Sequence, residues 1–194
     1  MSTAERLDAL VSAQQVRDLP PRYAAAYARL DLDELVRLYA PDVELHDGRR
    51  GRQALRDHFE RGMRSTGVGS TGVGSTVVGS TGGAGLHTVI LHTGDHLIDF
   101  AGPDSAQGSV YCLGEMQRTD GSWYRQTIIY TDAYTRLDGS WYFARQRRHE
   151  LVYGAPPLTR PNQLPAANWP ASQTGRGTLP GRWPSWQRFW GADA

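Results

Sequence analysis

The sequence lacks several features that would assign it to a broad class of proteins. It holds one cysteine, Cys112, so it can form no internal disulfide, which favours a reducing, cytoplasmic setting. No apolar run approaches the roughly 20 residues that a membrane-spanning helix needs. The first residues lack the apolar core of a signal peptide. The net charge is only +1, so we expect neither a nucleic-acid partner nor a membrane.

Two segments differ in composition from the rest of the chain. Residues 65–85 iterate glycine, serine, threonine and valine, which predicts a mobile loop or insertion. A phosphate-binding loop is excluded because no Gly-Lys-Ser/Thr follows and the chain has no lysine nearby. Residues 155–194 are rich in proline yet contain four tryptophans, so we expect this tail to dock on the domain or on a partner. The predicted domain is 1–154.

The segment Arg118–Tyr124 is repeated, with one change, as Arg136–Tyr142. Each copy carries Asp-Gly between runs rich in β-branched and aromatic residues, which predicts two tight hairpin turns. Two such turns join three antiparallel strands into a meander. The strands between them are longer than usual, so the sheet should twist and curl.

The order of predicted elements indicates an α+β fold. Hydrophobic spacing predicts helices over 1–17, 20–30, 31–40 and 51–63, a short strand at 43–45, and antiparallel strands from 86 to about 153. Pro20 and Pro21 fit the first turn of the second helix, and Asp31-x-x-Glu34 fits the start of the third. We expect a curved antiparallel sheet forming a cone, closed by the N-terminal helices and followed by the proline- and tryptophan-rich tail. Such a cone leaves a pocket at its open end.

Five strings of the sequence together form a characteristic pattern. They are Arg22-Tyr23-Ala24 through Asp33, Ala40-Pro41-Asp42-Val43, His92-x-x-Asp95-x-x-Ile98-x-Phe100, Gly108–Glu115, and Tyr130-x-Asp132-x-Tyr134-x-Arg136-x-Asp138-Gly139-x-Trp141. These strings resemble the SnoaL-like group of the nuclear-transport-factor-two-like superfamily. The resemblance covers about residues 15–153 without the glycine-rich tract. These strings mark the fold more strongly than the function, because this fold hosts isomerases, dehydratases, hydrolases, cyclases and non-catalytic binders.

The resemblance to scytalone dehydratase and to hexachlorocyclohexane dehydrochlorinase implies a proton-abstracting histidine. In that group an aspartate near the end of the first helix orients a histidine on a facing strand. The histidine position matches His92, but the aspartate position falls on Ala28. Asp31 lies one helical turn further and is an alternative partner, although its spacing also fits a helix N-cap.

Asp132 is a further candidate for catalysis. It sits between Tyr130 and Tyr134, on one side of a regular strand. That arrangement suits a pocket wall, and it equally suits a cross-strand ion pair with Arg145 or Arg147. His87, His92 and His96 alternate along one strand in a way that separates His87 from the other two, so no metal site is predicted.

Five residues are candidates for binding a substrate. Tyr23 and Tyr27 share a helix face above the cone, and His46 follows the short strand near the pocket mouth. Cys112 and Tyr130 lie on predicted meander strands, although a lone cysteine there also fits the core.

The sequence therefore leads to two functional hypotheses. The first is a cofactor-independent lyase or isomerase that acts on a small hydrophobic, oxygenated molecule of polyketide, terpenoid or steroid type, with His92 as the base. It requires His92 inside a closed cavity within reach of a carboxylate. The alternative is a non-catalytic binding or interaction module that has lost the catalytic acid. Members of the superfamily often pair through the sheet, so we expect a homodimer through a face carrying Trp123, Ile129 and Trp141.

Overall fold

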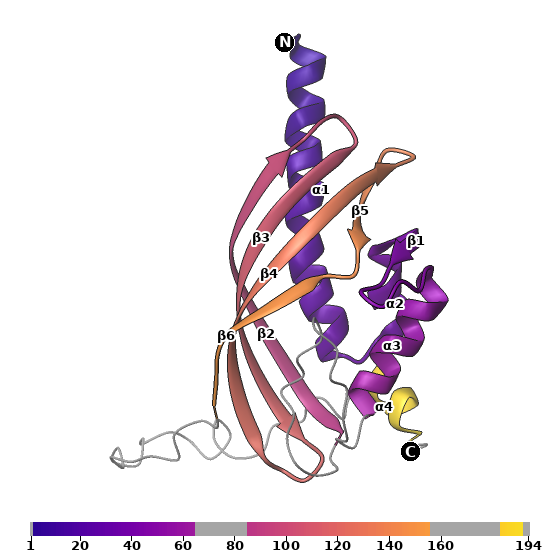
Figure 1. Cartoon of the computed structure of the whole chain (residues 1–194), viewed down its shortest axis with the longest axis vertical. Helices are drawn as coiled ribbons and strands as arrows, with labels where there is room; N and C mark the ends of the chain where they lie inside the picture. The colour runs from indigo at the N-terminus through magenta and orange to yellow at the C-terminus, as the bar shows by residue number, and fades with distance from the viewer. Residues whose placement is uncertain (1, 65–84, 156–182, 192–194) are drawn as a thin grey trace, which may run out of the picture.

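The computed structural model describes residues 2–64, 85–155 and 183–191 (Figure 1). Almost all of the predicted glycine-rich loop and most of the tail lie outside these residues. The elements are α1 Thr3–Ala28, α2 Leu32–Arg37, β1 Tyr39–Glu44, α3 Arg52–Arg64, β2 Leu86–Phe100, β3 Ser105–Arg118, β4 Trp123–Leu137, β5 Ser140–Arg145, β6 Arg148–Ala155 and α4 Pro184–Trp190. Within the described residues, no helix combines the length and hydropathy needed to cross a bilayer.

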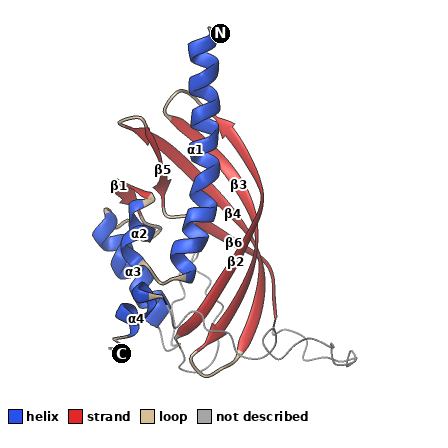
Figure 2. Ribbon diagram, turned by 180° about the vertical axis from the view of Figure 1, so that it is seen from behind, coloured by secondary structure: helices blue, strands red, loops and turns tan. Residues whose placement is uncertain are grey.

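The described strands form one curved sheet in the order β1-β5-β4-β3-β2, with β6 continuing along β4 beyond β5. All neighbouring pairs are antiparallel except β1 and β5. The helices lie on the concave side of the sheet (Figures 1 and 2). The predicted α+β cone is confirmed, and β2, β3 and β4 are long strands, as predicted, with 14 or 15 residues each.

The two copies of the Asp-Gly segment form different turns. Asp138 and Gly139 both have positive φ and close a two-residue β4–β5 loop, as the sequence predicted. In the β3–β4 loop only Gly121 has positive φ, and four residues lie between the two strands. Here the Asp120 carboxylate accepts hydrogen bonds from the amide and hydroxyl of Ser122, which stabilises the longer loop.

The first two predicted helices are one continuous helix, because α1 runs through Pro20 and Pro21. A helix-interior proline removes a backbone hydrogen bond. This cost is offset here by burial, since Val16, Pro20 and Tyr23 pack against the sheet. The N-terminal part of α1 projects past the helices that cover the sheet (Figure 2), and its apolar side chain Leu10 is exposed.

The last predicted strand is divided into β5 and β6 by a break at Gln146 and Arg147. At this break the backbone N–H of Gln146 donates to the backbone carbonyl of Glu44 and not to a residue of β4. Gln146 and Arg147 are both buried, whereas Arg145 and Arg148 on either side are exposed. The break therefore turns two consecutive polar side chains toward the inside of the cone.

Trp141 does not lie on an exposed face of the meander, and that part of the prediction was wrong. It is 4% exposed, and its ring contacts Phe100 on the side covered by α1. Its backbone N–H donates to Gln15 of α1 at 3.2 Å. The twist of the sheet brings this end of β5 under the long helix.

The C-terminal helix α4 packs against the ends of three other elements. Ser185 donates to the Arg29 carbonyl at 2.9 Å, and the Trp186 indole donates to the His87 carbonyl at 2.8 Å. The guanidinium of Arg64 on α3 lies over the Phe189 ring at 4.3 Å. These contacts tie α4 to α1, α3 and the start of β2.

Candidate active site

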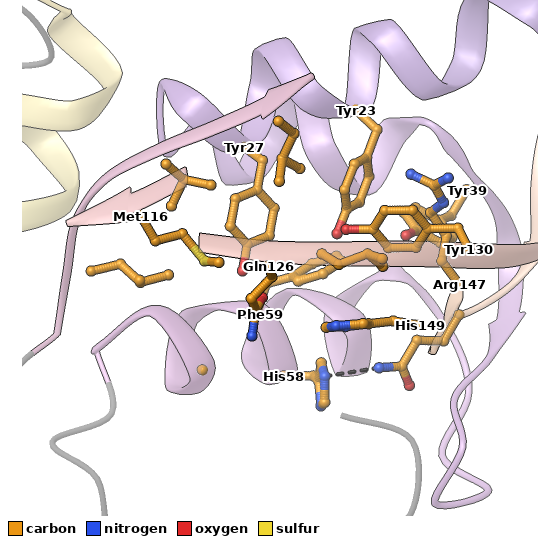
Figure 3. Close-up of a pocket in the computed structure, with 16 residues that line it drawn as sticks. Tyr23, Tyr27, Tyr39, His58, Phe59, Met116, Gln126, Tyr130, Arg147 and His149 are labelled. Atoms are coloured by element: carbon orange, nitrogen blue, oxygen red, sulfur yellow. Dashed lines mark hydrogen bonds between the residues drawn. The ribbon is translucent and has the colours of Figure 1, made fainter. Parts of the chain in front are cut away.

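A cavity lies between the helices and the concave face of the sheet (Figure 3). The volume of the cavity is about 80 Å³, which is room for several waters or one small ligand. The walls are mainly aromatic and aliphatic, and include Tyr23, Tyr27, Phe59, Leu91, Met116, Ile128 and Tyr130. The polar lining residues are His58, Gln126, Gln146, Arg147 and His149.

One end of the cavity is built on a fully buried ion pair. Arg147 donates from Nε to Asp132 Oδ1 at 2.8 Å and from Nη2 to Oδ2 at 2.7 Å. The two side chains are 2% and 0% exposed. Burial alone would lower the pKa of Arg147, but the charge and hydrogen bonds of Asp132 outweigh it and raise the pKa. The guanidinium of Arg147 therefore stays charged, and both carboxylate oxygens of Asp132 accept its hydrogen bonds.

Aromatic rings hold the guanidinium of Arg147 in place. It lies 3.9 Å from the ring centroid of Tyr130, 4.6 Å from that of Tyr23 and 4.8 Å from that of Phe143. These contacts are attractive because each ring face carries partial negative charge. The Nη1 atom of Arg147 is buried and has no hydrogen-bond partner among the described residues.

The ion pair extends away from the cavity through Tyr134 and His96. The Tyr134 hydroxyl donates to Asp132 Oδ2 at 3.1 Å. His96 Nε2 lies 2.9 Å from the same hydroxyl oxygen. Because the phenol has one proton, which goes to the carboxylate, His96 must be the donor to that oxygen. Asp132 Oδ2 thus accepts from both Arg147 and Tyr134, and Oδ1 accepts from Arg147.

Two histidines with lowered pKa line the cavity. Burial, reinforced by the charge of Arg147, lowers the pKa of His149. Burial also lowers the pKa of His58, and Arg49 and Arg61 add to this. His149 Nε2 is buried and has no partner within the described part of the chain. Figure 3 shows its ring reaching into the cavity beneath Tyr130.

The phenols of the cavity are neutral hydrogen-bonding groups. Burial raises the pKa of Tyr23 well above its usual value, and it raises the pKa of Tyr27 and Tyr130 as well. The rings of Tyr23 and Tyr130 lie 6.1 Å apart, and their hydroxyl ends point toward each other in Figure 3. Tyr23, Tyr27 and Tyr130, which the sequence suggested for substrate binding, all line the cavity.

His92, the predicted base, does not line the cavity. Val89 and Leu91 turn inward from β2, so His92 between Leu91 and Thr93 points to the exposed outer face. An irregularity between Thr93 and His96 shifts by one residue which side chains of β2 point inward. The side chain of His96 therefore points inward. The sequence pattern had placed His92 and His96 on the same face.

Asp31 and Asp132 also occupy other roles than the predicted catalytic one. Asp31 is the N-cap of α2 and accepts the Glu34 amide at 3.0 Å, which is the alternative left open by its spacing. Asp132 pairs with Arg147, one of the two arginines considered for it. Neither carboxylate lines the cavity.

His46 and Cys112 lie beside the cavity without lining it. His46 is exposed, and its Nε2 is 3.4 Å from the Arg147 carbonyl. Cys112 is buried in a small cluster with Val110, Ile128 and Tyr130. Burial raises the pKa of its thiol to about 11, so it is an inert core residue.

Sequence patterns missed His58, Gln126, Gln146 and His149 as lining residues. Gln146 and His149 line the cavity because of the β5–β6 break, and the spacing of hydrophobic residues in the sequence does not predict this break. His58 lies beside Phe59 on α3, and a helical wheel would have placed it near the buried face. Among the described residues, no group of three or more histidine, cysteine, aspartate or glutamate side chains is arranged to hold a metal ion.

Sequence comparison places the fold in a known family. The chain matches the SnoaL-like domain family over residues 8–147. A helix-closed cone of this kind defines the nuclear-transport-factor-two-like class, and this chain belongs to its SnoaL-like domain family. No curated protein matches the sequence.

Solved structures share the fold at low sequence identity. A scytalone dehydratase-like protein from Novosphingobium aromaticivorans DSM 12444 is 19% identical, with a TM-score of 0.59, over 79% of this chain and 92% of that one. A hexachlorocyclohexane dehydrochlorinase from Novosphingobium barchaimii LL02 is 18% identical, with a TM-score of 0.63, over 82% of this chain and 99% of that one. At these identities the likeness establishes the fold alone.

We predict that Asp132→Ala destabilises the protein by about 3–5 kcal/mol, because it leaves the buried Arg147 charge unpaired. The double variant Asp132→Leu/Arg147→Met removes both charges and should recover most of this loss. Urea unfolding of the three proteins measures the difference. A double variant no more stable than the single one would contradict the assignment of the loss to an unpaired charge.

We also predict that the free energy of unfolding falls as the pH drops below about 6.5. Burial is the first cause of a lowered pKa in His58, His96 and His149. At pH values between the lowered histidine pKa of the folded protein and the ordinary histidine pKa of the unfolded chain, the unfolded chain binds more protons. Lowering the pH therefore favours unfolding. Urea unfolding at about pH 7.5 and 5.5 tests this, and His149→Gln should reduce the difference. Equal stability at the two pH values would contradict it.

Proposed function

We propose that this protein is a cofactor-independent enzyme that moves a proton on a small, largely apolar, oxygenated molecule, leading to elimination or isomerisation. The observation that carries the proposal is a set of buried polar atoms that have no partner within the described residues and belong to residues lining an aromatic cavity, among them Arg147 Nη1, Gln126 Nε2 and His149 Nε2. Burying an unpaired polar group is costly. Oxygen acceptors on a ligand would satisfy Arg147 Nη1 and Gln126 Nε2, and a ligand donor would satisfy His149 Nε2. The aromatic walls would cover the apolar part of the ligand.

His149 replaces His92 as the proposed base. A histidine with a lowered pKa is neutral near pH 7 and can accept a proton at a free ring nitrogen. The Arg147 charge beside it disfavours the protonated ring, which makes the proton easy to pass on. His92 lies on the outer face and has no comparable access to the cavity.

Two neutral phenols and the charged guanidinium of Arg147 would hold the substrate oxygen. The hydroxyls of Tyr23 and Tyr130 and the Nη1 group of Arg147 are preorganised by the mutual packing of these side chains. Because Asp132 balances the charge of Arg147, the site favours an uncharged carbonyl or hydroxyl over a carboxylate in the ground state. Such donors stabilise negative charge that develops on the oxygen when a proton leaves the neighbouring carbon.

The names of the structural relatives fit this class of reaction. One is named for removing water from scytalone and the other for removing hydrogen chloride from hexachlorocyclohexane, and both substrates are small ring molecules. We extend only the reaction class and ligand size to this chain.

The test compares His149→Gln with His92→Ala on a panel of cyclic ketones and hydroxylated polyphenols. We expect His149→Gln to lower kcat/KM by about 10²-fold or more, since positioned general bases contribute that much. His92→Ala, on the outer face, should keep the activity. Loss of turnover in His92→Ala with turnover preserved in His149→Gln would overturn the assignment and restore His92.

The second candidate is a non-catalytic binding module, favoured by Ala28 at the family's acid position and by the outward position of His92. Titration of the same panel by calorimetry separates the two functions. Binding that Gln126→Leu weakens, with turnover of no compound by the wild type, would support the binding module.

We also propose a homodimer through the outer face of β2, β3 and β4. This face differs from the predicted one because Trp141 is buried and does not belong to it. This face exposes Ile90, Tyr111, Leu113 and Trp123. Leu113→Arg should shift the sedimentation coefficient from dimer to monomer, whereas Leu7→Arg on the exposed N-terminal part of α1 should not. A wild type that is monomeric at all concentrations would contradict the dimer.

A further inference from the structure

Gln146 lines the cavity and connects the segment after β1 to α3. It lies in the break between β5 and β6 and is 8% exposed. Its Oε1 accepts the backbone N–H of His46 at 3.1 Å, just after β1. Its Nε2 lies 2.8 Å from Nε2 of His58 on α3 (Figure 3).

The first of these contacts fixes the orientation of the Gln146 amide. A backbone N–H can only donate, so the amide atom facing His46 must be the oxygen. The NH₂ group must then face His58, and this group can only donate. His58 Nε2 is therefore the acceptor and carries no proton. The ring is neutral, and its proton resides on Nδ1.

We propose that Gln146 is a positioning residue that holds His58 as the neutral Nδ1–H tautomer, so that His58 offers the ligand an N–H donor while His149 offers an acceptor. Protonation of His58 Nε2 would place two N–H groups against each other. The two cavity histidines would thus have distinct roles, set by their environments rather than by their type. The donor role rests on the proposed function; the tautomer does not.

Other charged groups around His58 act in both directions. Arg49 and Arg61 disfavour the protonated ring, and so does His46, whereas Asp47 favours it. Asp47 is itself paired with Arg49 at 2.7 Å, which reduces its influence. Gln146 is the group that selects which ring nitrogen carries the proton, because it is the one placed against Nε2.

The tautomer is measurable without any ligand or activity. In protein labelled with ¹⁵N-histidine, long-range ¹H–¹⁵N spectra distinguish the two neutral tautomers and the charged ring, and His58→Gln assigns the signals. We expect the Nδ1–H form of His58 at about pH 7. An Nε2–H form or a charged ring at that pH would overturn the proposal.

Gln146→Glu supplies the matched test. A carboxylate accepts a hydrogen bond where the amide donates one, so His58 Nε2 should gain a proton and its titration should move up by about one pH unit or more. Gln107→Glu, an exposed position on β3, adds the same charge elsewhere and should leave the tautomer unchanged. If Gln146→Glu does not fold, Gln146→Ala removes the donor and should give a mixture of tautomers. An Nδ1–H signal unchanged in the folded Gln146 variant would overturn the proposal.

Activity separates this inference from the proposed function. In Gln146→Ala, kcat/KM should fall by at least the fraction of His58 that the spectra show has left the Nδ1–H form. An unchanged kcat/KM in a Gln146→Ala protein whose spectra show a mixture of tautomers would overturn the donor role. Failure of the wild type to turn over any compound would count against the proposed enzyme and the donor role, and the spectra would still decide the tautomer.

Discussion

The buried pair between Asp132 and Arg147 is the interaction on which the interior of the cone depends. It joins the middle of β4 to the break between β5 and β6 through two short hydrogen bonds. Neither charge would be tolerated alone at that depth. The aromatic rings of Tyr23, Tyr130 and Phe143 pack around the guanidinium, so α1 contacts the sheet at the same point.

This pair also sets the chemistry of the cavity. The positive charge of Arg147 contributes to the lowered pKa of His149, and its partner Asp132 is no longer available as a catalytic acid. The cavity thus combines neutral histidines, neutral phenols and one charge-balanced guanidinium. Such a site suits proton transfer beside a neutral oxygen, without the aspartate–histidine pair that the resemblance implied.

Much of the fold followed from local patterns. The Asp-Gly segments predicted the meander, and the Asp31 spacing predicted a helix start, because turns and caps depend on a few neighbouring residues. The shared inward face of Tyr130, Asp132 and Tyr134 followed from strand alternation. Continuity of α1 through Pro20 did not, since burial against the sheet outweighs the local cost of proline.

The sequence by itself determined the α+β cone, its long strands and the aromatic side chains of α1 and β4 that line the cavity, because each depends on short-range periodicity. Only the tertiary structure decided which polar groups meet there. An irregularity in β2 between Thr93 and His96 placed His92 and His96 on opposite faces, and the β5–β6 break brought Gln146, Arg147 and His149 into the cavity. A shift of one residue reverses the direction of every later side chain in a strand, and the packing of the whole sheet decides where such shifts occur.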